Sequence, residues 1–490
     1  MSSASLFFRK LDPARRAYIL GATAACIIVA GIFAEDAMAY FCIAIPAIVP
    51  LVLWLQAGAP GIPVLPAVSG LFFVYYAIPL LRGNIAAFGS DALVSAGITI
   101  GAFLLAASLV SWPFLVAARR SSGAPRSNLV SDAQIVRLVF VGLAAGSLFH
   151  LATISGALDA LGSSVGLVRS VVLTLGSVAC YLLGCARASR ALVGARWVAA
   201  AGGLCALILL SLSNLFLVSG IMNGLAAVFG YVMTRKRIPW VALGTAFILL
   251  SVLHAGKFEM RERYWLPHSQ SLQQSSIYQV PGMLTDWVTA GVGALLSGRA
   301  ESDVLERASL LHMLLLVERA TPSFVPYLEG QTYAMLPSML VPRFVDADKL
   351  QSQAVLNLLS LRYGLQQVGS SESTTIGWGL IAEAYANYGD PAVVAVGAVF
   401  GALCGALMLL SSGAAPLSTR MLVTIAATLT LFNLELDLSY LLTALAQSIA
   451  AILLLATIPK LLGRRRRPRP LVATGAGLAP GPLGDASSPR

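Results

Sequence analysis

Residues 391–411 read PAVVAVGAVFGALCGALMLLS and contain no charged side chain. About 20 apolar residues in a helix span the hydrocarbon core of a bilayer. The whole chain has this character, since 57% of its 490 residues are hydrophobic, only 11% are charged and the mean hydropathy is +0.80. A soluble domain averages about 25% charged residues. The composition excludes a soluble enzyme, a secreted disulfide scaffold and a disordered protein, and it predicts an all-α polytopic membrane protein.

Apolar runs of span length recur along the sequence, and we expect about twelve transmembrane helices. The run from 197 to 234 is long enough for two spans or one broken helix, and we divide it at Ser219 and Gly220. The twelve predicted spans are 18–34, 38–56, 65–81, 92–118, 136–154, 165–186, 197–213, 219–234, 238–255, 391–411, 421–437 and 440–459.

Charge placement predicts the orientation of these spans, because cytoplasmic loops are enriched in Lys and Arg. With both termini in the cytoplasm, nearly every basic cluster falls on the cytoplasmic side. These clusters are Arg119, Arg120 and Arg126; Arg187, Arg190 and Arg196; Arg235, Lys236 and Arg237; Arg420; and the arginines from Arg464 to Arg469. The short loops on the other side carry mainly acids, which are Glu35, Asp36, Asp159, Glu435 and Asp437, with Arg82 as the exception.

The predicted spans divide the chain into four parts. Residues 1–255 hold spans one to nine, 391–460 hold spans ten to twelve, and 461–490 form a basic cytoplasmic tail without order. Between the spans, residues 256–390 contain nine of the 33 basic and thirteen of the 22 acidic residues. A segment of this length is rarely a structureless loop, so we expect a helical extracytoplasmic domain that holds the active site.

The start of the tenth span has two local signals. Asp390 and Pro391 predict the N-cap and the first helical residue. Within the span, Gly397, Gly401 and Gly405 recur every four residues, which predicts close contact with another helix.

Common catalytic and cofactor motifs are missing from the sequence. There is no phosphate-binding glycine loop, no nucleophile elbow and no His or Cys cluster with metal spacing. We therefore expect no cofactor and a metal-independent mechanism. The net charge of +11 does not indicate nucleic-acid binding, because the basic residues flank spans and form no folded basic domain.

Basic residues on the outer side form the first candidate site. Lys257, Arg261 and Arg263 follow the ninth span directly, where they could bind an anionic head group or extend along the membrane interface beside acidic neighbours. Further along, Arg343 and Lys349 follow a proline-rich turn, and they could bind phosphate or point into solvent.

Polar residues near the tenth span form the second candidate site. Glu383 and Asn387 are four residues apart and share a helix face with Tyr385 nearby. A carboxylate shielded at the membrane boundary has a raised pKa and could act as a general base, or the group could be a polar helix end. His312 and Arg319 share a face of an amphipathic stretch, as a catalytic or a structural pair.

Together these stretches resemble the Wzy-type repeat-unit polymerases of bacterial O-antigen and exopolysaccharide assembly. The resemblance runs from about residue 200 to 405. It rests on Glu306-Arg307, Gly330-Gln-Thr-Tyr333, Pro342-Arg343, Lys349 and Glu383-Ala-Tyr-Ala-Asn-Tyr-Gly389. This sequence departs from the family pattern at two elements. The Trp and flanking prolines that the family has around the Lys are absent around Lys349. The segment Ser219-Gly-Ile-Met-Asn-Gly224 lacks the Arg of the corresponding family element.

The resemblance implies an inner-membrane glycosyltransferase that joins polyprenyl-diphosphate-linked oligosaccharides at the periplasmic face. Chain-length regulators, flippases and membrane lipids would be its partners. We expect Glu383 and His312 to be catalytic. The expected substrate-binding residues are Arg261, Arg263, Arg319, Arg343, Lys349, Tyr333, Tyr385 and Asn387. An O-antigen ligase would share this plan and differ in its acceptor. A flippase or transporter would instead show internal repeats and ionisable residues in the middle of its spans; we find no repeat, and ionisable residues are almost absent from the middle of the predicted spans.

Overall fold

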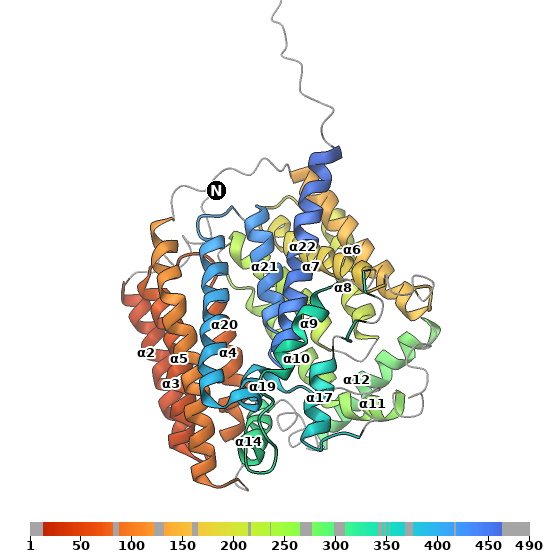
Figure 1. Cartoon of the computed structure of the whole chain (residues 1–490). Coiled ribbons are helices and arrows are strands. Elements are labelled where there is room, and N and C mark those ends of the chain that lie inside the picture. Colours follow the sequence, from red (N-terminus) through yellow and green to blue (C-terminus); the bar gives the residue numbers. More distant parts are fainter. Residues whose placement is uncertain are drawn as a thin grey trace, which may run out of the picture.

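The computed structural model describes a bundle of helices (Figure 1). The described residues are 13–81, 88–121, 132–158, 165–213, 217–235, 237–264, 277–297, 309–341, 345–346, 349–351, 353–367, 376–415 and 418–462. Their helices up to residue 255 are α2 (Pro13–Ile32), α3 (Ala37–Gln56), α4 (Val64–Phe72), η1 (Phe73–Ala77), η2 (Ile78–Leu81), α5 (Ser90–Arg120), α6 (Asp132–Ile154), α7 (Val165–Ala188), α8 (Gly194–Leu212), α9 (Leu217–Arg235) and α10 (Trp240–Ala255). The later ones are α11 (Lys257–Tyr264), η6 (Ile277–Gln279), α12 (Val280–Leu296), α14 (Leu310–Ala320), α15 (Gln331–Ala334), α16 (Leu336–Leu340), α17 (Ala354–Arg362), α19 (Gly379–Tyr388), α20 (Asp390–Ser411), α21 (Thr419–Leu431) and α22 (Leu438–Leu462).

The architecture is that of a multi-pass membrane protein. Within the described part of the chain, nine helices are long and apolar enough to cross a bilayer, and a tenth is added if α10 and α11, bent by 52°, count as one span. Each of the twelve predicted runs overlaps a helix or a continuous helical stretch. The apolar part of α2 and the 13-residue α21 are shorter than the others, so the predicted number of twelve spans stays a prediction.

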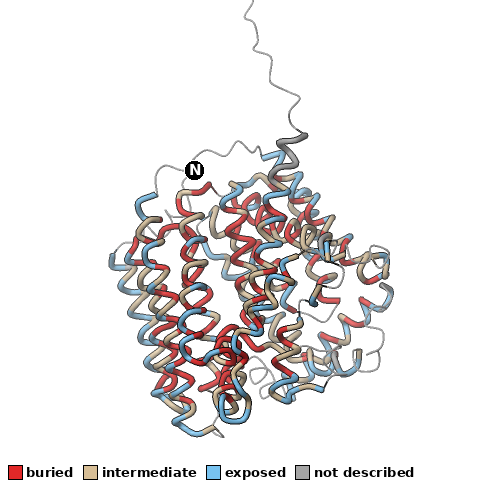
Figure 2. Tube along the Cα trace, in the orientation of Figure 1, coloured by how far each residue is buried: buried red, intermediate tan, exposed pale blue. Residues whose placement is uncertain are grey.

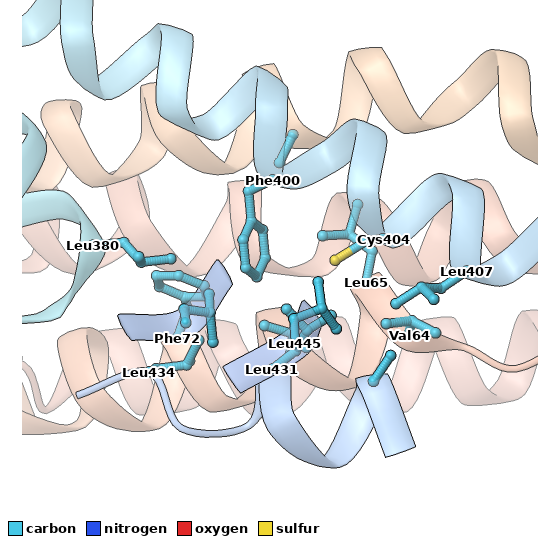
Figure 3. Packing of buried hydrophobic residues seen from close by; sticks show 14 of the residues in the cluster. Val64, Leu65, Phe72, Leu380, Phe400, Cys404, Leu407, Leu431, Leu434 and Leu445 are labelled. Carbon is cyan, nitrogen blue, oxygen red and sulfur yellow. The ribbon is translucent and has the colours of Figure 1, made fainter. Parts of the chain in front are cut away.

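Close packing of α5 and α20 confirms the glycine pattern in the tenth predicted span. A Cβ atom on Gly397 would lie 2.6 Å from the Phe103 carbonyl oxygen, and one on Gly401 would lie 2.2 Å from that of Ala107. Only residues without a side chain allow the backbones to approach this closely. The adjoining core is apolar and includes residues of α4, α19, α20, α21 and α22 (Figure 3), and within it the rings of Phe72 and Phe400 pack edge to face with centroids 6.0 Å apart.

Three details differ from the sequence predictions. The break between α8 and α9 falls after Leu212 rather than at Ser219 and Gly220, and Gly220 instead packs against Ile208 and Leu212 of α8. The N-cap of α20 is Gly389, not Asp390, because its positive φ of 68° favours glycine and Asp390 already belongs to the helix. Finally, α12 is an apolar helix inside the segment predicted to be polar.

The helices of the 256–390 segment gather at one end of the bundle. Figure 1 shows α11, α12, α14, α17 and α19 there, whereas α22 ends at the opposite end. α10, which leads into this group, has no buried residue, and Val241 is 86% exposed. Figure 2 shows buried residues in red within the bundle and exposed residues in pale blue along its outer helices. An apolar helix with so exposed a surface is suited to contact with lipid.

Candidate functional site

A cavity of about 2000 Å³ opens among the helices at this end of the bundle. Part of its lining comes from α10, α11 and α12, and part from η1, α14 and the turn between α21 and α22. The main hydrophobic core lies on the side of α14 and α19, while a smaller core around Met260 and Trp287 stabilises α11 and α12. The cavity thus lies between two separately packed groups of helices.

Basic side chains form the first wall of the cavity, which we call the cation wall. It consists of Arg169 on α7 with Lys257 and Arg263 on α11. Arg263 Nη1 lies 3.1 Å from Asp286 Oδ2 of α12, and the Tyr264 hydroxyl donates to the same oxygen at 2.9 Å. An exposed ion pair adds little stability but fixes the direction of a guanidinium group. Glu259 and Glu262 of α11 line the cavity as well, so this wall offers three cationic groups to an anion among acidic neighbours.

A second wall brings together groups suited to acid–base chemistry. It consists of Tyr75 on η1, His312 on α14 and Glu435 in the turn before α22. The Tyr75 hydroxyl donates to Glu435 Oε1 at 3.2 Å. Ser309, the N-cap of α14, accepts the His312 backbone amide, so the histidine sits in the first turn of this helix. The second wall combines an imidazole and a carboxylate in one cavity.

Glu383 lies outside the cavity lining and is fully buried. Its Oε2 accepts the Leu438 amide at 2.7 Å at the first residue of α22, and its Oε1 has no hydrogen-bond partner among the described residues. Burial raises its pKa to about 8, and the neighbouring carboxylate of Asp437 adds to the rise. Asp437 itself caps α22 by accepting the Tyr440 amide at 2.8 Å. Both side chains therefore satisfy backbone amides at the N-terminus of this helix.

Asn387 links two of the stretches on which the family resemblance rests, residues 330–333 and residues 383–389. Its Oδ1 accepts the Gly330 amide at 3.1 Å, and its Nδ2 donates to Thr332 Oγ1 and to the Glu383 carbonyl, both at 2.8 Å. The side chain is fully buried. The structure brings these two stretches together, and both polar atoms of the Asn387 side chain form hydrogen bonds there.

The remaining predicted substrate-binding residues have other surroundings. Arg319 is exposed on α14, and Lys349 donates to the carbonyl oxygens of Met339 and Val341 at 2.8 and 2.7 Å. The half-buried Tyr333 and Tyr385 have raised pKa values because of burial, that of Tyr385 reaching about 12. None of these four side chains is among the residues that line the cavity.

Two predicted residues, Arg263 and His312, line the cavity together. Arg343 and the side chain of Arg261 lie outside the described residues. The predicted site residues did not include Tyr75 or Glu435. Glu435 could have been found, because it is an acidic residue between the apolar segments that form α21 and α22. No group of three or more His, Cys, Asp or Glu side chains suited to a metal ion occurs in the part of the chain that the structure describes.

No protein-family model, curated protein or solved structure matches the chain.

Proposed function

We propose that this protein polymerises polyprenyl-diphosphate-linked oligosaccharide repeat units at the extracytoplasmic face of a bacterial inner membrane. The observation that supports this proposal best is the cavity at one end of a bundle of apolar helices, with a cation wall and a second wall that holds His312. A lipid-linked diphosphate sugar needs these features, because it presents charge and sugar beside the membrane.

The proposed reaction is glycosyl transfer without redox chemistry. A hydroxyl oxygen of the acceptor sugar attacks the anomeric carbon of the donor sugar. The bond from this carbon to the diphosphate oxygen breaks, and its electron pair leaves with the diphosphate. The cation wall with Lys257 and Arg263 compensates the charge that develops there. The proton of the attacking hydroxyl passes to His312.

A second cavity supports a lipid-linked substrate. It measures about 200 Å³ and shares Ala67, Leu225 and Phe432 with the large cavity. Its other lining residues are apolar apart from Thr428, whose hydroxyl donates to the Thr424 carbonyl. The first units of an isoprenoid chain would fit here, next to a diphosphate in the large cavity.

Topology is a part of the proposal that can be tested separately. With twelve spans and both termini in the cytoplasm, residues 256–390 lie outside the cytoplasm. We expect a reporter fused after residue 330 to be active outside the cytoplasm, and fusions after residues 125, 190 and 415 to report a cytoplasmic position. A cytoplasmic report at residue 330 would contradict both the orientation and the placement of the cavity.

The decisive experiment reconstitutes the purified protein in liposomes with lipid-linked repeat units. The expected product is a ladder of longer lipid-linked chains. Transfer to a lipid A core acceptor without a ladder would instead identify a ligase, and movement of unmodified substrate across the membrane would identify a flippase. In a deletion strain the same proposal predicts surface glycan with single repeats.

A further inference from the structure

Glu435 is a carboxylate in the large cavity that the proposed reaction does not yet use. It lies in the turn between α21 and α22, two residues before Asp437. Asp437 is fully buried in the cap of α22, whereas Glu435 is exposed to the cavity. The turn therefore directs one acid to the helix and the other to whatever occupies the cavity.

The backbone at Glu435 is fixed by contacts with the segment before α19. Its carbonyl oxygen accepts the Gly379 amide at 3.1 Å. A Cβ atom on Gly377 would lie 2.9 Å from the Glu435 Cβ, so this close approach requires glycine. These contacts hold the residue against a neighbouring segment of the chain, and such a fixed backbone suits a binding residue.

The side chain of Glu435 is oriented as well. The Tyr75 hydroxyl donates to Oε1 at 3.2 Å, and no hydrogen bond from a described residue to Oε2 is found. Three other acids line the cavity: Asp286, which Arg263 and Tyr264 bind, and Glu259 and Glu262, which lie on α11 beside the basic residues of the cation wall. Glu435 is thus a carboxylate that faces the cavity from the second wall, with no cation of the described residues within 4.0 Å.

We propose that Glu435 binds the acceptor sugar, with Tyr75 as its positioning residue. A carboxylate accepts hydrogen bonds from sugar hydroxyls, and charge-assisted bonds of this kind are stronger than neutral ones. Of the two walls, only the cation wall has Lys and Arg side chains, so the diphosphate binds there and the sugar hydroxyls bind at the second wall. This inference rests on the proposed function and assigns the acceptor oligosaccharide to the second wall.

The test uses two substrates that each play one role. The donor has its acceptor hydroxyl blocked, and the acceptor carries a non-transferable link to its lipid. We expect Glu435→Gln to lower kcat/KM for the acceptor about 5–15-fold, because glutamine still accepts hydrogen bonds but without the charge that strengthens them. The KM for the donor stays at the wild-type value. Tyr75→Phe should also lower kcat/KM for the acceptor, by about 3–10-fold, because it removes the hydroxyl that positions Glu435.

Glu35→Gln is the matched control, since it makes the same change at an exposed acid that does not line the cavity. Thermal unfolding of each variant shows whether the fold is kept. Wild-type transfer with an unchanged acceptor KM in Glu435→Gln overturns the inference alone, as does an equal effect on donor and acceptor. A wild-type protein that forms no glycosidic bond overturns the proposed function itself.

Discussion

Replacing His312 by glutamine should lower the polymerisation rate about 10²–10⁴-fold, the usual effect of losing a general base. His312 lines the cavity from α14, and the N-cap Ser309 holds its backbone rather than its ring. Glutamine keeps this backbone bond and a polar side chain of similar length but cannot take up the proton. The measurement is single-turnover transfer with saturating donor and acceptor.

The protein level and the thermal unfolding temperature of His312→Gln should match those of the wild type. The ring contacts Phe88, with centroids 5.8 Å apart, so His312→Phe provides a second variant that keeps an aromatic ring at this contact. Both variants should be equally slow if the imidazole is the base. Near wild-type transfer in His312→Phe would show that the ring only packs and that the proton goes elsewhere.

The long helices could be predicted because the bilayer imposes a single requirement on them. Residues 391–411 had to be a helix, and the small residues at every fourth position had to face a neighbour. That neighbour proved to be α5, which contacts Gly397 and Gly401 through its backbone. Helix pairing of this kind cannot be derived from the periodicity of one helix.

The helix α12 shows where the length criterion fails. It has 17 residues, lies among polar segments, and was assigned to a polar domain. Its neighbour α10 approaches it at Gly256 and Gly291, and Trp287 Nε1 donates to the Leu253 carbonyl at 2.6 Å. α12 also provides Asp286, which pairs with Arg263 of the cation wall, yet no local pattern in the sequence predicts the packing of α10 against α12.

The candidate site could be predicted only in part. The basic residues after span nine and His312 are local features, and two of them, Arg263 and His312, do line one cavity. Tyr75 and Glu435 are 360 residues apart in sequence, so their hydrogen bond is a property of the fold. For Glu383 and Asn387 the shared face was derivable from their spacing, but spacing does not reveal that this face is buried.

The burial of Glu383 leads to the second large expected effect, which concerns stability. Replacement by alanine removes the acceptor of the buried Leu438 amide at the start of α22. An unsatisfied buried donor costs about 1–3 kcal/mol, and the lost side chain leaves a cavity in addition. We expect Glu383→Ala to lower the unfolding temperature and the amount of inserted protein. Glu383→Gln should keep both, because its carbonyl oxygen accepts the same amide.

The pH dependence separates the two roles of Glu383. Its pKa rises from an ordinary value of 4.5 to about 8 in the folded protein, so the folded state retains a proton that the unfolded chain releases. This contribution to stability is complete below pH 4.5 and is lost as the pH rises through 8. The wild-type unfolding temperature should therefore fall between pH 5 and 8.5. It should fall less in Glu383→Gln, whose amide stays neutral. If Glu383→Gln instead stops polymerisation and keeps the wild-type pH profile of stability, Glu383 acts as the base that its motif indicates.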